Sequence, residues 1–323
     1  MEIDRVFVDG KYSKQVYSIQ DQIKNGDYSL QVVSEFNDCN LYLSFDLIDY
    51  AFLNNYSNRK IIKVLIRQEP KIVLPQTYME KNMTNFDFII DVGKPKSGKL
   101  RVLNWPQDLT SYIKNPKIKN NRVVIINSNL LSLTKGENYS LRRQAINGIK
   151  ELDLYGYQWN NSFHKKIKTF FIELKKYTLR FNLLRIKGIK YYFRYYNNYL
   201  GEVEDKRSII SMYKYCLVIE NSSDYLSEKL FDALLSGCVP IYVGPDLAKY
   251  EIPRSLYIQA QPNLDDIRFK INEAKKINYN EWVENLNIWL SESETYENWS
   301  EHLFLSKILK LVKDITNNIH LQP

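Results

Sequence analysis

The stretch KYCLVIENSSDYLSEKLFDALLSGCVPIYVGP, residues 214–245, decides the fold that this sequence predicts. Its apolar start, residues 214–221, predicts a buried strand, and residues 224–237 predict a helix closed by a glycine. The run CVPIYVG then predicts a second buried strand that ends at a Gly-Pro turn. A strand, a helix and a strand in this order are typical of an open, parallel α/β sheet.

Polar residues follow the first of these strands. Glu220, Asn221 and Ser222 would lie at the carboxyl edge of the sheet, where ligands of open α/β folds bind. The amino end of the next helix favours an anion. Lys229 lies in the first turn or two of that helix, where a cation opposes the helix dipole, and a bound anion would relieve the conflict. The alternative is that Lys229 extends into water and that Glu228 is an ordinary acid near a helix start.

Further out, the same α/β pattern recurs on both sides of residue 118. Before it, the apolar runs RVFV, CNLYLSF, IIKVLIR and FDFIIDV predict strands, and a helix is expected at residues 46–56. After it, residues 122–129 predict a strand, residues 139–151 a helix and residues 263–317 a run of helices, of which the last is amphipathic. The chain therefore predicts an α/β fold in two halves.

Length and composition agree with two domains. At about 150 residues per domain, 323 residues suggest two, and 44% apolar with 25% charged residues is a globular balance. We expect two facing Rossmann-like domains with a cleft between them, residues 1–118 and residues 119–323. The last helix is able to pack back on the first domain.

Disulfide and metal chemistry are both disfavoured. Cys39, Cys216 and Cys238 are widely spaced and odd in number, so they form no disulfide framework and fit a reducing compartment. With three histidines and no D-x-D pair, the sequence predicts no metal site. The first residues lack a leader pattern, and no apolar run reaches the roughly 20 residues that span a bilayer, so we expect a cytoplasmic protein.

Residues 164–199 carry the whole net charge of the chain. They hold ten Lys or Arg against one acid, Glu173, while the net charge of the full sequence is +8. The same residues include ten Phe or Tyr, and their first half predicts a basic amphipathic helix within an insertion at residues 160–199. Three interpretations compete: a solvated helical excursion, a surface for anionic membranes, and a nucleic-acid site, which we rank last because no nucleic-acid module accompanies it.

The deciding stretch resembles the signature of glycosyltransferase family 10, the α-1,3/1,4-fucosyltransferases. The matching elements are Tyr213-Lys214-Tyr215, Glu220-Asn221-Ser222, Tyr225, Glu228-Lys229, Gly237-Cys238-Val239-Pro240 and Gly244-Pro245. Tyr250, Pro253 and the run SLYI follow in the family's order. Because so many positions match across about 45 residues, this signal is far more specific than a lone glycine motif.

The resemblance extends upstream more weakly. The runs IINSN, which ends at Asn129, and SLRRQAI look like the family's first donor-domain strand and an Arg-bearing helix. The family's arginine holds the nucleotide diphosphate, and Arg142 is the better match, with Arg143 an open alternative. The run RQEPKIVLP resembles the acceptor-domain element in which Glu69 is the general base. Pro70 restricts Glu69 to an extended conformation, and the alternative for Glu69 is a structural carboxylate.

The resemblance implies a GT-B-like fold, with an acceptor-side domain at residues 1–118 and a donor domain at residues 119–323. The implied reaction is transfer of L-fucose from GDP-β-L-fucose to a glycan hydroxyl with inversion, in surface polysaccharide or lipopolysaccharide synthesis. Its donor-binding residues would be Arg142, Asn221, Tyr225, Glu228, Lys229, Glu220, Ser222 and Asn129, with Glu69 as the base. No cofactor and no divalent metal are expected, because Arg142 and Lys229 can neutralise the departing diphosphate.

Two alternatives stay open. The turn ENSSDYLSEK is shorter than in many family members, which leaves room for another GDP-sugar as donor in the same fold. The second alternative is of another class, a non-catalytic basic protein that binds membranes or nucleic acid. The expected partners are a GDP-sugar, an oligosaccharide or lipid-linked glycan and an anionic membrane surface, with nucleic acid disfavoured, and the protein would act in the cytoplasm or on the inner face of the membrane.

Overall fold

The computed structural model describes residues 3–10, 14–25, 28–46, 61–95, 102–113, 119–132, 134–176 and 189–319. The helix expected at residues 46–56 lies almost wholly outside them. The chain forms two compact units: unit 1 is Met1–Asp108 with Glu297–Pro323, and unit 2 is Leu109–Tyr296. The first segment of unit 1 thus ends before residue 118. The last helix belongs to unit 1 and not to unit 2. The earlier boundary has a physical reason. The Ile113 amide donates to the Leu235 carbonyl oxygen of unit 2 at 3.1 Å, so the chain is already held by unit 2 before residue 118.

Unit 1 is a parallel sheet with helices. Its elements are β1 (Arg5–Asp9), α1 (Lys14–Lys24), β2 (Gln31–Val32), β3 (Leu41–Phe45), β4 (Ile62–Arg67), α2 (Glu80–Met83), β5 (Phe88–Val92), β6 (Val102–Leu103) and α11 (Phe304–Ile319). The strands lie in the order β2-β1-β3-β4-β5-β6, and every neighbouring pair is parallel. The strand pattern that the apolar runs predicted is therefore confirmed.

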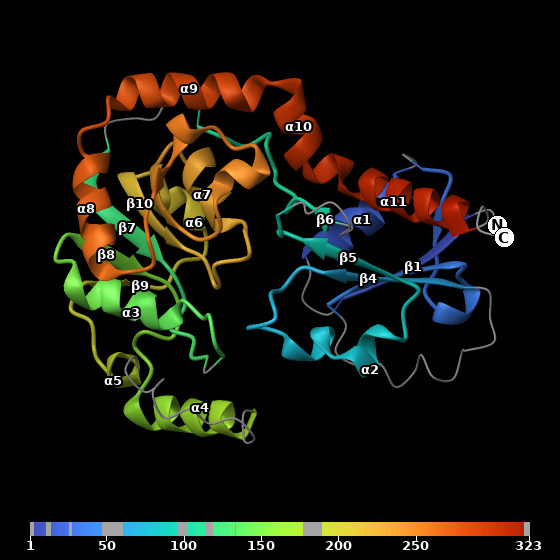
Figure 1. Ribbon diagram of the computed structural model, residues 1–323, viewed down its shortest axis with the longest axis horizontal. Coiled ribbons are helices and arrows are strands. Elements are labelled where there is room, and N and C mark those ends of the chain that lie inside the picture. Colours follow the sequence, from blue (N-terminus) through green and yellow to red (C-terminus); the bar gives the residue numbers. More distant parts are fainter. Residues whose placement is uncertain are drawn as a thin grey trace. The chain divides into compact units, whose positions relative to one another are not determined.

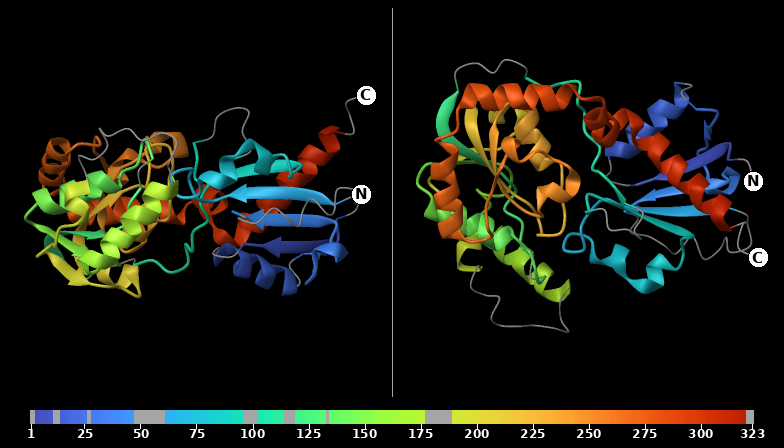
Figure 2. Two further views of the ribbon diagram at one scale, coloured as in Figure 1. Left: turned by 90° about the horizontal axis from the view of Figure 1, so that it is seen from below. Right: turned by 45° about the horizontal axis from the view of Figure 1, so that its top comes forward.

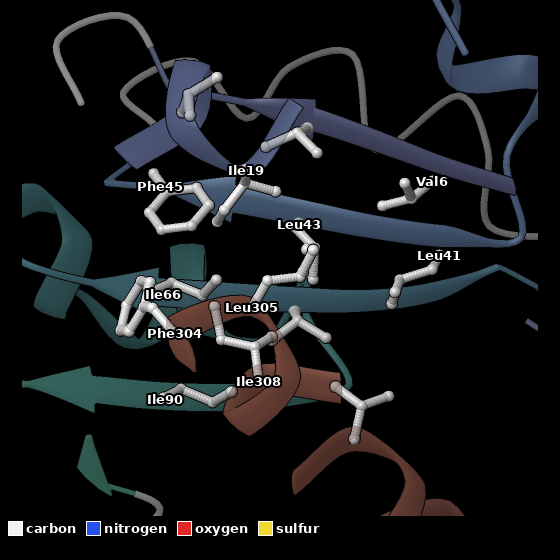
Figure 3. Close-up of a cluster of buried hydrophobic side chains, with 14 of the residues drawn as sticks. Val6, Ile19, Leu41, Leu43, Phe45, Ile66, Ile90, Phe304, Leu305 and Ile308 are labelled. Atoms are coloured by element: carbon white, nitrogen blue, oxygen red, sulfur yellow. The ribbon is translucent and has the colours of Figure 1, made fainter. Parts of the chain in front are cut away.

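The core of unit 1 explains why its last helix is amphipathic. Phe304, Leu305 and Ile308 of α11 are buried in one cluster with Leu43 and Ile66 of the sheet (Figure 3). The right-hand view of Figure 2 shows α11, in red, running across the strands of this sheet. Since the apolar stripe of α11 covers the sheet, residues near the end of the chain complete the core of the first unit.

Unit 2 holds the second parallel sheet (Figure 1). Its elements are β7 (Asn120–Ile126), α3 (Tyr139–Gly148), β8 (Leu152–Tyr155), α4 (Phe163–Lys176), α5 (Ile189–Tyr192), β9 (Tyr199–Gly201), α6 (Lys206–Ile210), β10 (Tyr213–Ile219), α7 (Lys229–Leu235), β11 (Val239–Val243), β12 (Ile258–Gln259), α8 (Leu264–Ala274) and α9 (Tyr279–Ser291). Helix α10 (Ser293–Trp299) then leads the chain from unit 2 back to unit 1.

The strand order of unit 2 creates a switch point. The order is β12-β11-β10-β7-β8-β9, so the chain builds outward from β7 to β9, then crosses over and builds outward from β10 to β12. Strands β7 and β10 are adjacent and parallel, and their connections leave in opposite directions. In open parallel sheets the crevice outside the carboxyl ends of two such strands is where ligands bind.

One predicted helix of unit 2 is shorter in the structure, and the helix expected in the first half of the basic insertion is confirmed. The helix expected at residues 224–237 begins only at Lys229, because the residues before it form a turn held by side chains. Helix α4 covers the first part of the basic insertion, residues 163–176, and residues 177–188 lie outside the described residues. Within the residues that the structure describes, no helix combines the length and the apolar character needed to cross a membrane.

Candidate active site

A hollow of about 650 Å³, open to solvent, lies at the switch point of unit 2. We call it the switch-point hollow. Its walls come from the ends of β7 and β8, the loops after β9 and β10, and the first turns of α3, α6 and α7. The lining residues are Ile126, Asn127, Ser128, Leu130, Arg142, Gly156, Tyr157, Val203, Lys206, Asn221, Glu228 and Lys229. Four of the residues that the sequence singled out, Arg142, Asn221, Glu228 and Lys229, therefore line one hollow.

Gly156 allows the strand ends to come this close. Its φ is +124°, a backbone conformation that residues with a side chain rarely adopt. A Cβ atom built on Gly156 would lie 2.1 Å from the carbonyl oxygen of Asn127, which is the first residue after β7. The Gly156 amide also donates to the Gly201 carbonyl oxygen at 2.9 Å, so the ends of β8 and β9 are joined at the rim of the hollow.

Arg142 is a buried cation whose orientation is fixed. Its side chain is 3% exposed, and its Nε donates to the carbonyl oxygen of Ile219, the last residue of β10, at 3.0 Å. Its Nη2 also donates to Asn221 Oδ1 at 2.8 Å. Burial lowers the pKa of Arg142, yet an arginine stays charged in proteins. The guanidinium thus reaches the hollow as a preorientated positive group.

Arg143, the open alternative, is directed elsewhere. It is buried, and its Nη1 donates to the Leu130 carbonyl oxygen at 2.6 Å while its Nη2 donates to Ser140 Oγ at 3.4 Å. It is not one of the residues that line the switch-point hollow. Of the two neighbouring arginines, Arg142 therefore faces the candidate site and Arg143 braces the loop beside it.

Glu228 stands between two lysines. Its Oε1 lies 3.6 Å from Lys229 Nζ and 3.4 Å from Lys206 Nζ. Burial favours the neutral form of Glu228, but the two ammonium groups outweigh it and lower the pKa of this carboxyl to about 2. Lys229 Nζ also donates to Ser227 Oγ at 3.0 Å. Lys229 is thus partnered by side chains although it begins a helix.

The turn before α7 is built around Glu220. The Glu220 carboxylate is completely buried and accepts the Ser227 amide at 3.0 Å and the Ser227 hydroxyl at 2.6 Å. Burial raises the pKa of Glu220. The carboxylate is therefore used inside the turn, and Glu220 is not among the residues that line the hollow. Helix α7 is short, with seven residues that begin at Lys229. We therefore attribute the attraction of this hollow for an anion to its cationic side chains and not to the end of a helix.

Three other candidates lie near the hollow without lining it. Ser222 and Tyr225 are buried in the same turn. Asn129 follows β7, and its amide donates to the Tyr157 carbonyl oxygen at 2.9 Å. Within the described part of the chain, the buried side-chain amide of Asn129 and the hydroxyl of Ser222 have no hydrogen-bond partner. Among the donor-binding candidates, these two and Tyr225 therefore do not line the hollow.

Sequence reasoning missed several lining residues, of which Lys206 matters most. Lys206 is the first residue of α6 and its side chain is 47% exposed, within reach of both Glu228 and Asp232. The Asp205-Lys206 pair is visible in the sequence just before β10, but only the contact with Glu228 shows that it belongs to the site. Asn127 lies within the run IINSN and Tyr157 follows β8, but the sequence prediction named neither of them as a site residue.

Glu69 lies in unit 1, in the loop after β4. Its amide donates to Asp46 Oδ2 at 3.0 Å, and its carbonyl oxygen accepts the Tyr78 hydroxyl at 3.0 Å. Asp46 follows the neighbouring strand β3, and burial, with Glu69 nearby, raises the pKa of Asp46 to about 7. The structure thus places a second carboxyl group, absent from the sequence prediction, beside the proposed base.

The charges of the switch-point hollow suit an anion. Arg142, Lys206 and Lys229 supply three positive charges and Glu228 one negative charge, which leaves a net charge of about +2. A planar guanidinium together with mobile ammonium groups can bind the oxygens of a diphosphate. In the described residues no group of His, Cys, Asp and Glu side chains is arranged to hold a metal ion.

Comparison with known proteins identifies the fold. The fold is that of the GT-B glycosyltransferases: a crystal structure of an α1,3-fucosyltransferase superposes with a TM-score of 0.52 and 14% identity, covering 96% of this chain and 90% of that one. The UDP complex of Anabaena Alr3699/HepE gives a TM-score of 0.55 and 11% identity, covering 98% and 100%. Residues 173–318 match the model of glycosyltransferase family 10 (fucosyltransferase), C-terminal region.

Curated relatives match over shorter segments. Human alpha-(1,3)-fucosyltransferase 4 is 48% identical over 54 residues, which are 15% of this chain and 10% of the relative. Mouse 4-galactosyl-N-acetylglucosaminide 3-alpha-L-fucosyltransferase 9 is 42% identical over 73 residues, 20% of each chain. These matches thus span a tenth to a fifth of the relatives' own length. Arg142, Asn129 and Glu69 lie outside the family segment, whereas Lys206 and the turn from Glu220 to Lys229 lie inside it.

Proposed function

We propose that this protein is an inverting fucosyltransferase that moves L-fucose from GDP-β-L-fucose to a hydroxyl of a glycan. The observation that carries the proposal is the meeting of Arg142, Lys206 and Lys229 in one hollow at the switch point of a Rossmann-ordered sheet. Such a hollow suits the diphosphate of a nucleotide sugar. The family segment and the named relatives support fucose as the sugar.

In this mechanism the carboxylate of Glu69 takes the proton from the acceptor hydroxyl as its oxygen attacks the anomeric carbon. The bond from that carbon to the diphosphate breaks, and GDP leaves with the electron pair. Arg142, Lys206 and Lys229 stabilise the negative charge that grows on GDP, so we expect transfer to continue in the presence of EDTA. Asn221 and Glu228 hold hydroxyls of the ribose or the fucose.

The test begins with calorimetric titration of the protein with GDP, UDP and CMP, first in EDTA and then with manganese. Selective binding of GDP in EDTA, followed by transfer from GDP-fucose to a galactosyl-N-acetylglucosamine acceptor, is the expected result. Transfer from another GDP-sugar in place of GDP-fucose would favour the alternative donor. Binding to none of the nucleotides would contradict the proposal that this protein is a glycosyltransferase.

We also propose that helix α4 brings the enzyme to the anionic inner face of a membrane, where a lipid-linked glycan or surface polysaccharide is its acceptor. Figure 1 shows α4 at the edge of unit 2, beyond α5. Lys165 and Lys168 are exposed on α4 beside Phe171, whose side chain is 56% exposed. Lysines next to an exposed aromatic group are the composition of helices that lie on anionic bilayers.

Co-sedimentation with vesicles tests this part. Vesicles with anionic lipid should retain the protein, and the double variant K165E/K168E should stay in the supernatant. The matched control is K249E/K276E, which reverses two exposed lysines elsewhere in unit 2 and should bind like the wild type. Equal binding of all three proteins, or no preference for anionic over neutral lipid, would contradict the proposal.

A further inference from the structure

Hydrogen bonds link the carboxyl ends of two neighbouring strands of unit 1. Strands β3 and β4 are parallel neighbours, with Phe45 paired to Ile66. Asp46, the first residue after β3, has a φ of +50°, and its amide donates to the Ile66 carbonyl oxygen at 3.1 Å. Aspartate is one of the few residues with a side chain that enters this left-handed region readily. The conformation turns Asp46 toward the loop after β4.

The carboxyl group of Asp46 holds that loop. Its Oδ1 and Oδ2 each accept the Gln68 amide at 3.1 Å, and Oδ2 also accepts the Glu69 amide at 3.0 Å. The next residue, Pro70, has no amide hydrogen. On the other side, the Tyr78 hydroxyl donates to the Glu69 carbonyl oxygen. Both backbone groups of Glu69 are therefore fixed by side chains.

The cations near Asp46 are paired with another carboxylate, so the Asp46 carboxyl group can accept hydrogen bonds from the loop. Arg67, a cation that acts on Asp46, makes a two-point ion pair with Asp91 at 2.8 and 2.7 Å, and Lys94 lies 3.4 Å from the same carboxylate. Asp9, at the end of the neighbouring strand β1, is an acid whose pKa is raised by burial. The hydrogen bonds of Asp46 thus go to backbone amides. Removing a carboxyl group from water costs free energy, and a loop exposed on the surface would need no such buried group to hold it.

We infer that Asp46 is a positioning residue for Glu69, whose backbone it holds so that the Glu69 carboxylate keeps one direction. The inference rests on the proposed function of Glu69 as the base. A base must be held in a productive geometry, and a displacement of about 1 Å can cost about 10²-fold in rate. Strand geometry alone does not provide this, since Glu69 lies beyond the last residue of β4.

Amide hydrogen exchange and kinetics on the full-length protein test the inference. In D46N, which keeps the shape and one acceptor oxygen, the amides of Gln68 and Glu69 should exchange at least about tenfold faster. The matched control is D87N, because Asp87 Oδ2 accepts the Lys63 amide at 2.8 Å at the other end of the same strand. D87N should release the Lys63 amide and leave Gln68 and Glu69 protected.

The kinetic result separates positioning from general damage. In D46N the kcat for fucose transfer should fall about 10²-fold, while the KM for GDP-fucose and the Kd for GDP stay within twofold of the wild type. Unchanged exchange at Gln68 and Glu69, or faster exchange with an unchanged kcat, would overturn the inference. If the wild type transfers no sugar, the proposed function fails, and the exchange data still decide whether Asp46 holds the turn.

Discussion

Lys229 occupies a position that its helix does not favour, and its contacts show why it is tolerated. A cation in the first turn opposes the helix dipole. The structure places Glu228 Oε1 at 3.6 Å and Ser227 Oγ at 3.0 Å from its ammonium group. The sequence pointed to Lys229 and Glu228 as a pair, whereas Lys206, which completes the group, became visible only as a contact.

Replacing Lys229 by alanine should lower the kcat of fucose transfer by about 10²- to 10³-fold, because one group that stabilises the leaving diphosphate is lost. The measurement is steady-state transfer from GDP-fucose, with thermal unfolding as a check of the fold. Lys249→Ala, an exposed lysine outside the hollow, is the control and should keep the wild-type rate. Unchanged turnover in Lys229→Ala would remove Lys229 from the site.

Asp46 should make stability depend on pH. Burial raises the pKa of its carboxyl from 3.8 to about 7, so between these values the folded protein holds a proton that the unfolded chain has released. The corresponding contribution to the free energy of unfolding is complete below about pH 4 and is lost as the pH rises through about 7. Asparagine does not titrate, so the free energy of unfolding of the wild type minus that of D46N should fall across this window.

Urea unfolding at pH 4.5, 6 and 8 checks this prediction. D87N, which removes another carboxyl group that accepts a backbone amide of β4, is measured in parallel. A difference between wild type and D46N that is the same at all three pH values would show that Asp46 is not held in the way that its contacts indicate.

At the scale of elements, the loops differ most from the sequence prediction. The periodicity of residues 224–237 predicted one helix, but the Glu220 carboxylate holds Ser227 and delays the start of α7 to Lys229. Strand positions were predicted well, because apolar runs mark buried strands directly. Local patterns thus located the elements, and side-chain contacts within the preceding turn set where α7 begins.

Gly156 is the element-scale position most sensitive to change. Gly156→Ala should lower the free energy of unfolding by at least about 2 kcal/mol and weaken GDP binding, since its Cβ would meet the Asn127 carbonyl oxygen at the rim of the hollow. Gly201→Ala is a matched control: its φ is +129°, and no heavy atom among the described residues lies within 4 Å of the Cβ position. Urea unfolding and GDP titration of both variants provide the measurement.

The two substitutions separate backbone strain from steric overlap. Gly201→Ala introduces only the strain of a positive φ, so we expect a smaller loss of stability and wild-type affinity for GDP. Equal losses of stability and affinity in both variants would mean that the close approach of β8 to the loop after β7 has no special role in shaping the hollow.

At the scale of the whole molecule, unit 1 is discontinuous in sequence. Residues 297–323 belong to it, and Leu305, Ile308 and Val312 of α11 are completely buried in its core. Unit 2 contains every residue that lines the switch-point hollow. The candidate base Glu69 and the candidate anion site therefore depend on different cores for their stability.

Ending the chain after residue 296 should damage unit 1 and spare unit 2. Losing α11 exposes the sheet of unit 1, and burial of Phe304, Leu305 and Ile308 alone is worth about 1.5–3 kcal/mol per side chain. We expect the thermal transition of unit 1 to be lost or shifted strongly downward while GDP still binds. The double variant S306A/K310A, which changes the same helix without removing these apolar side chains, is the control. Loss of GDP binding in the truncated chain would contradict the expectation that unit 2 stays folded without an intact unit 1.

The sequence by itself determined the α/β class, most strands and helices, and four of the residues that line the switch-point hollow, because apolar periodicity and a dense motif are local properties. Only the tertiary structure decided the strand order, the use of Glu220 inside a turn, the choice of Arg142 over Arg143, and the links of Lys206 to Glu228 and of Asp46 to Glu69. Apart from the turn around Glu220, each of these brings together groups from separate strands or helices. Such contacts depend on how the sheet is assembled, and the spacing of residues along the chain does not encode them in any local pattern.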